Sequence, residues 1–146
     1  MWRTSDKRGS RRVRTPVVLG LDFGGTKIAA AVADLQGNRL AEGITGTEPC
    51  RGVLWNFDQG ARLARGLMRT AGHETNLVAI GACTFGIPTE EGVLLAPAIP
   101  GWEQLAFARE LANALQCSTV RVETDVKAAA AAETNSGALV GADPAI

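Results

Sequence analysis

Residues 17–27 of the chain are VVLGLDFGGTK, a β-branched and apolar run followed by a polar bend with paired glycines. The run at 17–21 is typical of a short buried strand. Because paired glycines allow backbone angles closed to other residues, Asp22–Lys27 is predicted to be a hairpin turn. The segment 28–33 is too short for a comfortable helix and is predicted to be a second strand. Residues 39–45 predict a third strand, which completes an antiparallel meander.

The rest of the chain alternates helix and strand patterns. Apolar residues recur every three or four positions from Leu54 to Ala71, with arginines off the stripe, which predicts an amphipathic helix ending at Gly72. Similar patterns predict a strand at 77–83, a helix at 105–115, a strand at 119–123 and a helix from Val126 to about Glu133. The order βββαβαβα favours an α/β domain with a mixed sheet, because strand–helix–strand passages form right-handed crossovers between parallel strands.

The bulk composition excludes several classes of protein. A length of 146 residues with 46% hydrophobic and 21% charged residues fits one ordinary globular domain, not a disordered or collagen-like chain. Overall charge cancels, but the segment 1–15 carries six basic residues and one acid. Two interpretations of this segment stay open: a basic disordered tail or misplaced start, and an arm that attracts nucleic acid or anionic lipid. No apolar run is long enough for a signal peptide or a membrane-spanning helix.

The cysteines give no sign of a metal centre. Cys50, Cys83 and Cys117 form no CxxC pair, and His73 is the single histidine. We expect buried or half-buried thiols in a reducing cytoplasm. A catalytic pair of one cysteine with His73 is the alternative, which no local feature favours.

Two polar segments follow predicted strands, where α/β sheets place their ligands: Asp22–Lys27 and Glu123–Asp125. The first can offer backbone N–H groups, a hydroxyl and the Lys27 amine to phosphate oxygens, while Asp22 can hold a hydrated Mg²⁺. It matches neither the P-loop nor the dinucleotide fingerprint, so a plain turn stays the alternative. Asp125 is either a helix cap or a carboxylate that accepts a proton from a substrate hydroxyl.

Four motifs follow one another along the chain: LGLDFGGTKIAAAVAD (19–34), CTFGIP (83–88), LLAPAIPGW (94–102) and VETDVKAA (122–129). In this order and spacing they resemble the first phosphate motif, the Gly/Pro loop, the segment after it and the catalytic segment of the ROK family. That family comprises repressors, open reading frames and sugar kinases, within the actin-like ATPase superfamily. The resemblance covers about residues 16–143.

The resemblance implies an RNase H-like α/β domain at residues 16–146, one lobe of a two-lobe, glucokinase-like kinase that uses ATP and Mg²⁺. It implies a base at Asp125. It assigns the ATP phosphates and Mg²⁺ to Asp22, Gly24, Gly25, Thr26 and Lys27, and the sugar to Gly86, Thr124 and Asp125. The family's structural zinc site falls in the other lobe, so no residue here is assigned to it.

Three features depart from the family pattern. Thr124 and Lys127 stand where asparagines are expected, which removes an amide contact to the sugar and adds a cation near the pocket. The chain ends at Ile146, where the second lobe should begin. We therefore expect a truncated N-terminal lobe with little or no activity alone and an exposed apolar interdomain face.

Two alternatives to a kinase lobe stay open: a sugar-responsive transcriptional regulator of the same family and a noncatalytic remnant. The regulator would need a DNA-binding module upstream of the first strand. Otherwise the expected partners are a sugar and ATP in the cytoplasm, with no membrane and no nucleic acid. The resemblance also implies that full-length proteins of this kind are often homo-oligomeric.

Overall fold

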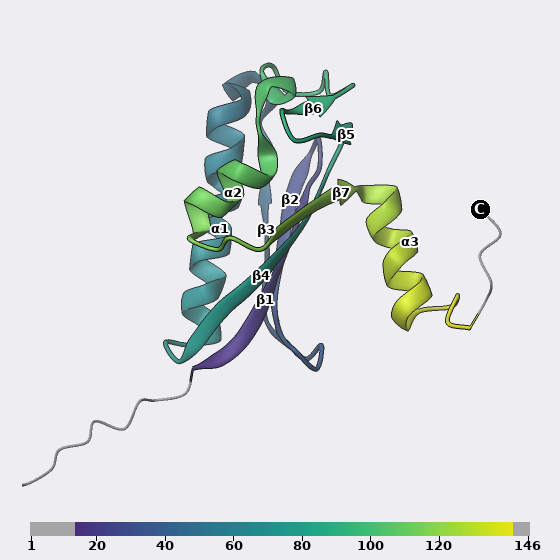
Figure 1. The fold of residues 1–146 in the computed structure, drawn as a ribbon. Coiled ribbons are helices and arrows are strands. Elements are labelled where there is room, and N and C mark those ends of the chain that lie inside the picture. Colours follow the sequence, from purple (N-terminus) through teal and green to yellow (C-terminus); the bar gives the residue numbers. More distant parts are fainter. Residues whose placement is uncertain (1–13, 142–146) are drawn as a thin grey trace, which may run out of the picture.

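The computed structural model describes residues 14–141, and Figure 1 shows a twisted sheet with helices on both faces. Its strands lie in the order β3-β2-β1-β4-β7, while β5 and β6 form a separate hairpin. The strands are β1 (Thr15–Phe23), β2 (Lys27–Asp34), β3 (Arg39–Gly46), β4 (Thr75–Thr84), β5 (Ile87–Pro88), β6 (Val93–Leu94) and β7 (Val120–Thr124). The helices are α1 (Gly52–Ala71), α2 (Phe107–Leu115) and α3 (Asp125–Ser136), with 3-10 turns η1 (Pro49–Arg51) and η2 (Trp102–Gln104).

The predicted α/β class and mixed sheet are confirmed. β1 pairs antiparallel with β2, and β2 with β3, whereas β1 with β4 and β4 with β7 pair in parallel. The β5–β6 hairpin is not foreseen by the sequence pattern, because strands of two residues are too short to show a period. β1 begins at Thr15, inside the segment predicted as a tail, and residues 1–13 of that segment lie outside the described residues.

One face of the sheet holds the core. Alternate residues of β1 are buried toward α1 and α2: Val17, Leu19, Leu21 and Phe23. The Phe23 ring centroid lies 4.9 Å from that of Phe107, edge to face, and 5.8 Å from that of Trp102. The core therefore extends to the last residue of β1, just before the glycine-rich bend.

Helix α1 packs closely on β2 and β3, through residues that overlap with the predicted stripe at Ala61 and Ala64 but differ from it at Leu54. Its buried residues are Asn56, Gly60, Ala61, Ala64 and Leu67. The prediction that Leu54 faces the core is wrong, since this side chain is 76% exposed. Asn56 is buried instead, because its side-chain amide donates to the carbonyls of Glu48 at 2.9 Å and Gly52 at 2.7 Å and accepts from the Glu48 N–H.

The other face of the sheet is open. Its floor consists of small residues, among them Gly20, Ala29, Ala31 and Gly81, and a hollow of about 920 Å³ lies over it. Helix α3 stands on this side, opposite α1 and α2 (Figure 1), and it buries none of its residues. Across residues 14–141, no helix has the length and apolar character to cross a bilayer.

Candidate functional site

The C-terminal ends of β1, β4 and β7 share one edge of the sheet, since these strands run parallel. Asp22 is in register with Cys83, and Cys83 with Glu123. Their side chains belong to the open face, because Phe23, in the next position along β1, is buried on the opposite face. Both bends singled out in the sequence, after Asp22 and after Glu123, therefore leave the sheet at the same edge.

The bend at residues 24–27 is held by backbone and side-chain bonds. The Gly24 N–H donates to the Lys27 carbonyl at 2.9 Å, which closes the hairpin turn. Thr47, just beyond β3, donates its hydroxyl to the Gly24 carbonyl at 2.9 Å and its N–H to the Thr26 carbonyl at 3.0 Å. These bonds fix the backbone while the side chains of Thr26 and Lys27 stay exposed.

The reason for glycine in this bend differs from the one predicted. The described glycines with positive φ do not include Gly24 or Gly25, so neither uses the left-handed region. A Cβ on Gly24 would come within 2.9 Å of the Lys27 carbonyl oxygen. Position 24 therefore requires glycine because the Lys27 backbone lies too close for a side chain, and not because of a positive φ. Beside it, a Cβ on Gly25 would lie 4.0 Å from that of Ala98, so the 94–102 segment borders the bend.

Cys83 lies between the two bends, a position that sequence reasoning missed. Its thiol donates to the Asp22 carboxylate with a Sγ–Oδ1 distance of 3.4 Å. Burial, together with the charge and hydrogen bond of Asp22 and the charge of Asp125, raises the pKa of Cys83 to about 12. The thiol therefore lies within the electrostatic field of both carboxylates. Only the strand register, absent from sequence patterns, could have signalled this.

The other thiols follow the prediction in part. Cys117 is buried, as expected, but Cys50 in η1 is exposed, so the prediction is wrong there. The segment 49–51 is a surface turn that buries no residue, which leaves the Cys50 thiol in solvent. His73 lies just before β4, at the opposite end of that strand from Cys83, so the alternative of a pair between these two residues has no geometric support.

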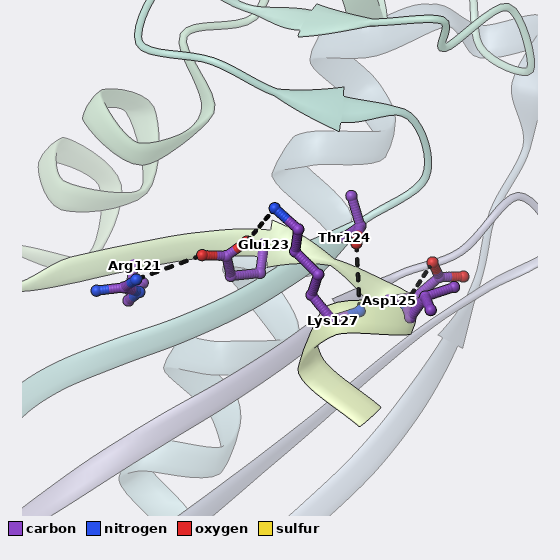
Figure 2. A network of polar contacts seen from close by, with 6 residues as sticks. Arg121, Glu123, Thr124, Asp125 and Lys127 are labelled. Atoms are coloured by element: carbon purple, nitrogen blue, oxygen red, sulfur yellow. Dashed lines mark hydrogen bonds and ion pairs between the residues drawn. The ribbon is translucent and has the colours of Figure 1, made fainter. Parts of the chain in front are cut away.

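Helix α3 starts with both a capping hydroxyl and an exposed carboxylate (Figure 2). Thr124 is the N-cap, and its hydroxyl oxygen accepts from the Lys127 N–H at 3.3 Å. Asp125 is the first helical residue, exposed, with Oδ1 accepting from the Val126 N–H at 2.8 Å. The capping role considered for Asp125 is therefore filled by Thr124, and one oxygen of Asp125, Oδ2, accepts no hydrogen bond from residues 14–141.

The side-chain amine of Lys127 extends back toward β7. Its amine lies 3.7 Å from Glu123 Oε2, and Arg121 lies 3.5 Å from the other oxygen of the same carboxylate. Figure 2 shows Lys127 and Asp125 extending to different sides of the helix start. The extra cation expected near the pocket is thus paired with Glu123.

Gly86 occupies a position open only to glycine. Its φ is +83°, and a Cβ there would lie 2.5 Å from the Leu94 carbonyl oxygen. Just before it, the buried Thr84 hydroxyl accepts from the Trp102 indole N–H at 2.9 Å. The Gly/Pro loop and the 94–102 segment are thereby locked together, and β5 packs beside β7 at the site edge.

The donor set limits what kind of cation could bind. Within residues 14–141 no group of three or more His, Cys, Asp or Glu side chains could hold a metal ion. A single exposed carboxylate at Asp22 instead fits Mg²⁺, which keeps several waters and binds through one or two carboxylates together with phosphate oxygens. Lys27, exposed and without an ion pair to any described residue, fits an anionic group in the same bend.

Comparison with known proteins decides the family. The model of the ROK family matches residues 18–143, which includes both bends and the strands between them. The chain belongs to the ROK family. It is 34% identical over 125 residues to a glucokinase of Streptomyces coelicolor, a match that covers 83% of this chain and 36% of the glucokinase.

Solved structures of the family share the fold. A ROK hexokinase from Thermus thermophilus matches with a TM-score of 0.66 and 33% identity, over 81% of this chain and 38% of that one. A ROK family glucokinase from Streptomyces griseus, in complex with glucose and AMPPNP, matches with a TM-score of 0.66 and 31% identity, over 83% of this chain and 37% of that one. This ROK chain thus spans only a little over a third of the length of each of these three relatives.

Proposed function

We propose that this chain supplies the ATP-phosphate site and the catalytic base of a glucokinase-like ROK enzyme, which transfers the γ-phosphoryl group of ATP to a hexose hydroxyl. The observation that carries the proposal is that Asp22, near the end of β1, and Asp125, directly after β7, lie at the same edge of the sheet, on either side of Cys83 in β4. Support comes from the glucokinase relative and from the Streptomyces griseus structure with glucose and AMPPNP.

The bend after β1 is proposed to hold the ATP phosphates. Gly24 and Gly25 let the backbone approach the phosphate oxygens, and Thr26 and Lys27 contribute a hydroxyl and a positive charge. Asp22 would hold the hydrated Mg²⁺ that accompanies the nucleotide, and the ion would supply neutralisation of charge on the phosphate oxygens, a main requirement of phosphoryl transfer.

The start of α3 is proposed to act on the sugar. The Asp125 carboxylate takes the proton from a sugar hydroxyl, and the oxygen of that hydroxyl forms a bond to the γ-phosphorus of ATP. At the same time the bond between this phosphorus and the bridging oxygen breaks, and ADP leaves. The Thr124 hydroxyl accepts one backbone bond at 3.3 Å and keeps its own proton available for a sugar oxygen. Gly86, which the close approach of the Leu94 carbonyl oxygen keeps as glycine, is proposed to present the backbone of its loop to the sugar.

The proposal covers one lobe of the enzyme. Apolar side chains remain exposed around the site edge, with Ile87 at 48%, Leu94 at 56% and Val126 at 74% exposure. They suit a surface that packs against the remainder of a two-lobe protein, whose closure completes the site. Little turnover is expected from the 146 residues alone. The free thiols of the described chain fit a reducing cytoplasm.

A chimera tests this function. Residues 16–143 replace the corresponding portion of the Streptomyces coelicolor glucokinase, and ADP release is followed with glucose, mannose, N-acetylglucosamine and fructose. We expect sugar-dependent turnover that Asp125→Asn lowers about 10²–10⁴-fold in kcat, the usual contribution of a general base. Asp58→Asn on α1, an exposed carboxylate paired with Arg62, is the matched control and leaves kcat unchanged.

Either of two results would remove the proposal. Turnover that survives Asp125→Asn would take the base role from Asp125. A chimera that folds, as judged by circular dichroism, and still turns over none of the sugars would leave the lobe a noncatalytic remnant.

A further inference from the structure

The side chain of Asp22 has one polar partner among residues 14–141, and that partner is Cys83. The thiol has a single proton and two acceptors within reach, Asp22 Oδ1 at 3.4 Å and the Leu21 carbonyl oxygen at 3.7 Å. A carboxylate is the stronger acceptor of the two, and it is also the nearer. The proton therefore lies toward Asp22.

The position of Cys83 makes this contact specific. β4 lies between β1 and β7 in the sheet, so position 83 is flanked by Asp22 on one strand and by Glu123 on the other. The thiol is half-buried, and the other positions beside Asp22 on this face are Gly20, Ala29 and Gly81, so no bulky side chain supports the Asp22 carboxylate from the sheet. The S–H donor is what holds its orientation.

We infer that Cys83 is a positioning residue for Asp22: its thiol donates to Oδ1, fixes the carboxylate at the end of β1 and leaves Oδ2 directed outward for the hydrated cation of Mg·ATP. The inference rests on the proposed function for the part that concerns Mg·ATP. A cysteine thiol of ordinary acidity, with a pKa of about 8.5, keeps its proton at neutral pH and is therefore a donor there.

Infrared absorption of the S–H stretch tests the contact without any ligand, using the 146-residue chain. The spectrum of the wild-type chain minus that of Cys83→Ser isolates the Cys83 band. The expected band lies at lower frequency than that of Cys117, whose thiol donates to a neutral carbonyl, that of Thr119, at 3.7 Å. Asp22→Ala shifts the Cys83 band to higher frequency and leaves the Cys117 band in place. An S–H stretching frequency of Cys83 that does not change in Asp22→Ala would overturn the inference.

Binding of Mg·ATP to the same chain, measured by calorimetry, tests the consequence. Cys83→Val removes the donor with little change of volume, and the Kd for Mg·ATP is expected to rise about fivefold, the equivalent of one hydrogen bond. Cys83→Ser keeps a donor and restores affinity to within about twofold. Cys117→Ser, which replaces a buried thiol that donates to the Thr119 carbonyl, leaves the affinity unchanged.

Two outcomes separate this inference from the proposed function. If Cys83→Val lost as much affinity for ATP without Mg²⁺ as for Mg·ATP, Cys83 would act on the fold and not on the cation-binding carboxylate. That result would contradict the positioning role. Absence of Mg·ATP binding to the wild-type chain would count against the proposed phosphate site in this lobe, while the infrared shift still decides whether Cys83 holds Asp22.

Discussion

The face of the sheet that α1 and α2 cover is closed by aromatic and aliphatic side chains, whereas the face toward α3 has a floor of glycine and alanine. On the closed face Trp102 and Phe107 are 0% and 1% exposed, and on the open face α3 buries no residue. Adjacent residues of β1 belong to different faces, with Phe23 in the core and Asp22 on the open side. Stability and chemistry are therefore assigned to alternate positions of the same strands.

This difference predicts that substitutions of equal size have unequal effects on the two sides. Changes on the closed face should alter the free energy of unfolding of the whole domain. Changes on the open face and in α3 should alter local order and ligand contacts while the domain stays folded.

The largest effect is expected from Trp102→Ala. The substitution empties a fully buried site and leaves the Thr84 hydroxyl without its indole donor, so the free energy of unfolding should fall by about 3–5 kcal/mol. Trp55→Ala is the matched control, since this ring is partly exposed with the Arg51 guanidinium 4.7 Å from its centroid, and its loss should be about 1 kcal/mol. Urea unfolding gives both values, and equal losses would contradict the placement of Trp102 in the core of the closed face.

The next effect comes from a pair of glycines in α1. A Cβ on Gly60 would come within 2.4 Å of the Phe23 ring, which the surrounding rings prevent from moving, so Gly60→Ala should cost about 1–3 kcal/mol. On Gly66 the nearest atom would be the flexible end of Arg69 at 3.9 Å, so Gly66→Ala should stabilise by up to about 1 kcal/mol through helix propensity. Opposite signs of the two shifts in urea midpoint are the expected result.

A third effect depends on pH. The pKa of Cys83 is raised from 9.0 to about 12 by burial and by Asp22, so the folded chain keeps a proton that the unfolded chain releases. This contribution is fully present below pH 9 and is lost as the pH rises toward about 12. The free energy of unfolding of the wild-type chain should therefore fall more steeply over that range than that of Cys83→Ser. If the two curves of unfolding free energy against pH were parallel, the thiol would have the same pKa in the folded and the unfolded chain.

Local sequence patterns were enough to predict the elements that depend on neighbours in the chain. The strand at 17–21, the glycine bend and the strand at 28–33 follow from apolar runs and turn residues, and all are confirmed. The helix of residues 54–71 is confirmed, but its buried side was placed wrongly at Leu54. Asn56 is buried on that side because its side-chain amide donates to the Glu48 carbonyl, on the other side of η1. A polar residue is not part of a hydrophobic pattern, so the sequence did not indicate this burial.

Contacts between distant positions could not be predicted in this way. Thr47 holds the bend through bonds to residues 21 to 23 positions earlier, and Trp102 donates to Thr84 across 18 positions. Cys83 meets Asp22 only because β4 pairs beside β1 in one particular register. The candidate site residues were found by resemblance to a family, and the thiol between them, which the motif does not single out, needed the sheet.

The smallest effect is expected at the start of α3, where it tests whether the open side is energetically separate. Thr124→Ala removes the hydroxyl that accepts from the Lys127 N–H, which should cost about 1 kcal/mol of helix stability. Because α3 buries no residue, the loss should appear as faster amide exchange in the first turn, with the urea midpoint of the domain unchanged. Thr124→Ser keeps the cap and should leave amide exchange unaltered. Thr134→Ala is the control for a change in α3 away from its cap, since the Thr134 hydroxyl donates to the Ala130 carbonyl within the helix at 2.8 Å. A lower domain midpoint in Thr124→Ala alone would mean that the start of α3 is coupled to the core through β7, and that the orientation of Asp125 depends on the packing of the closed face.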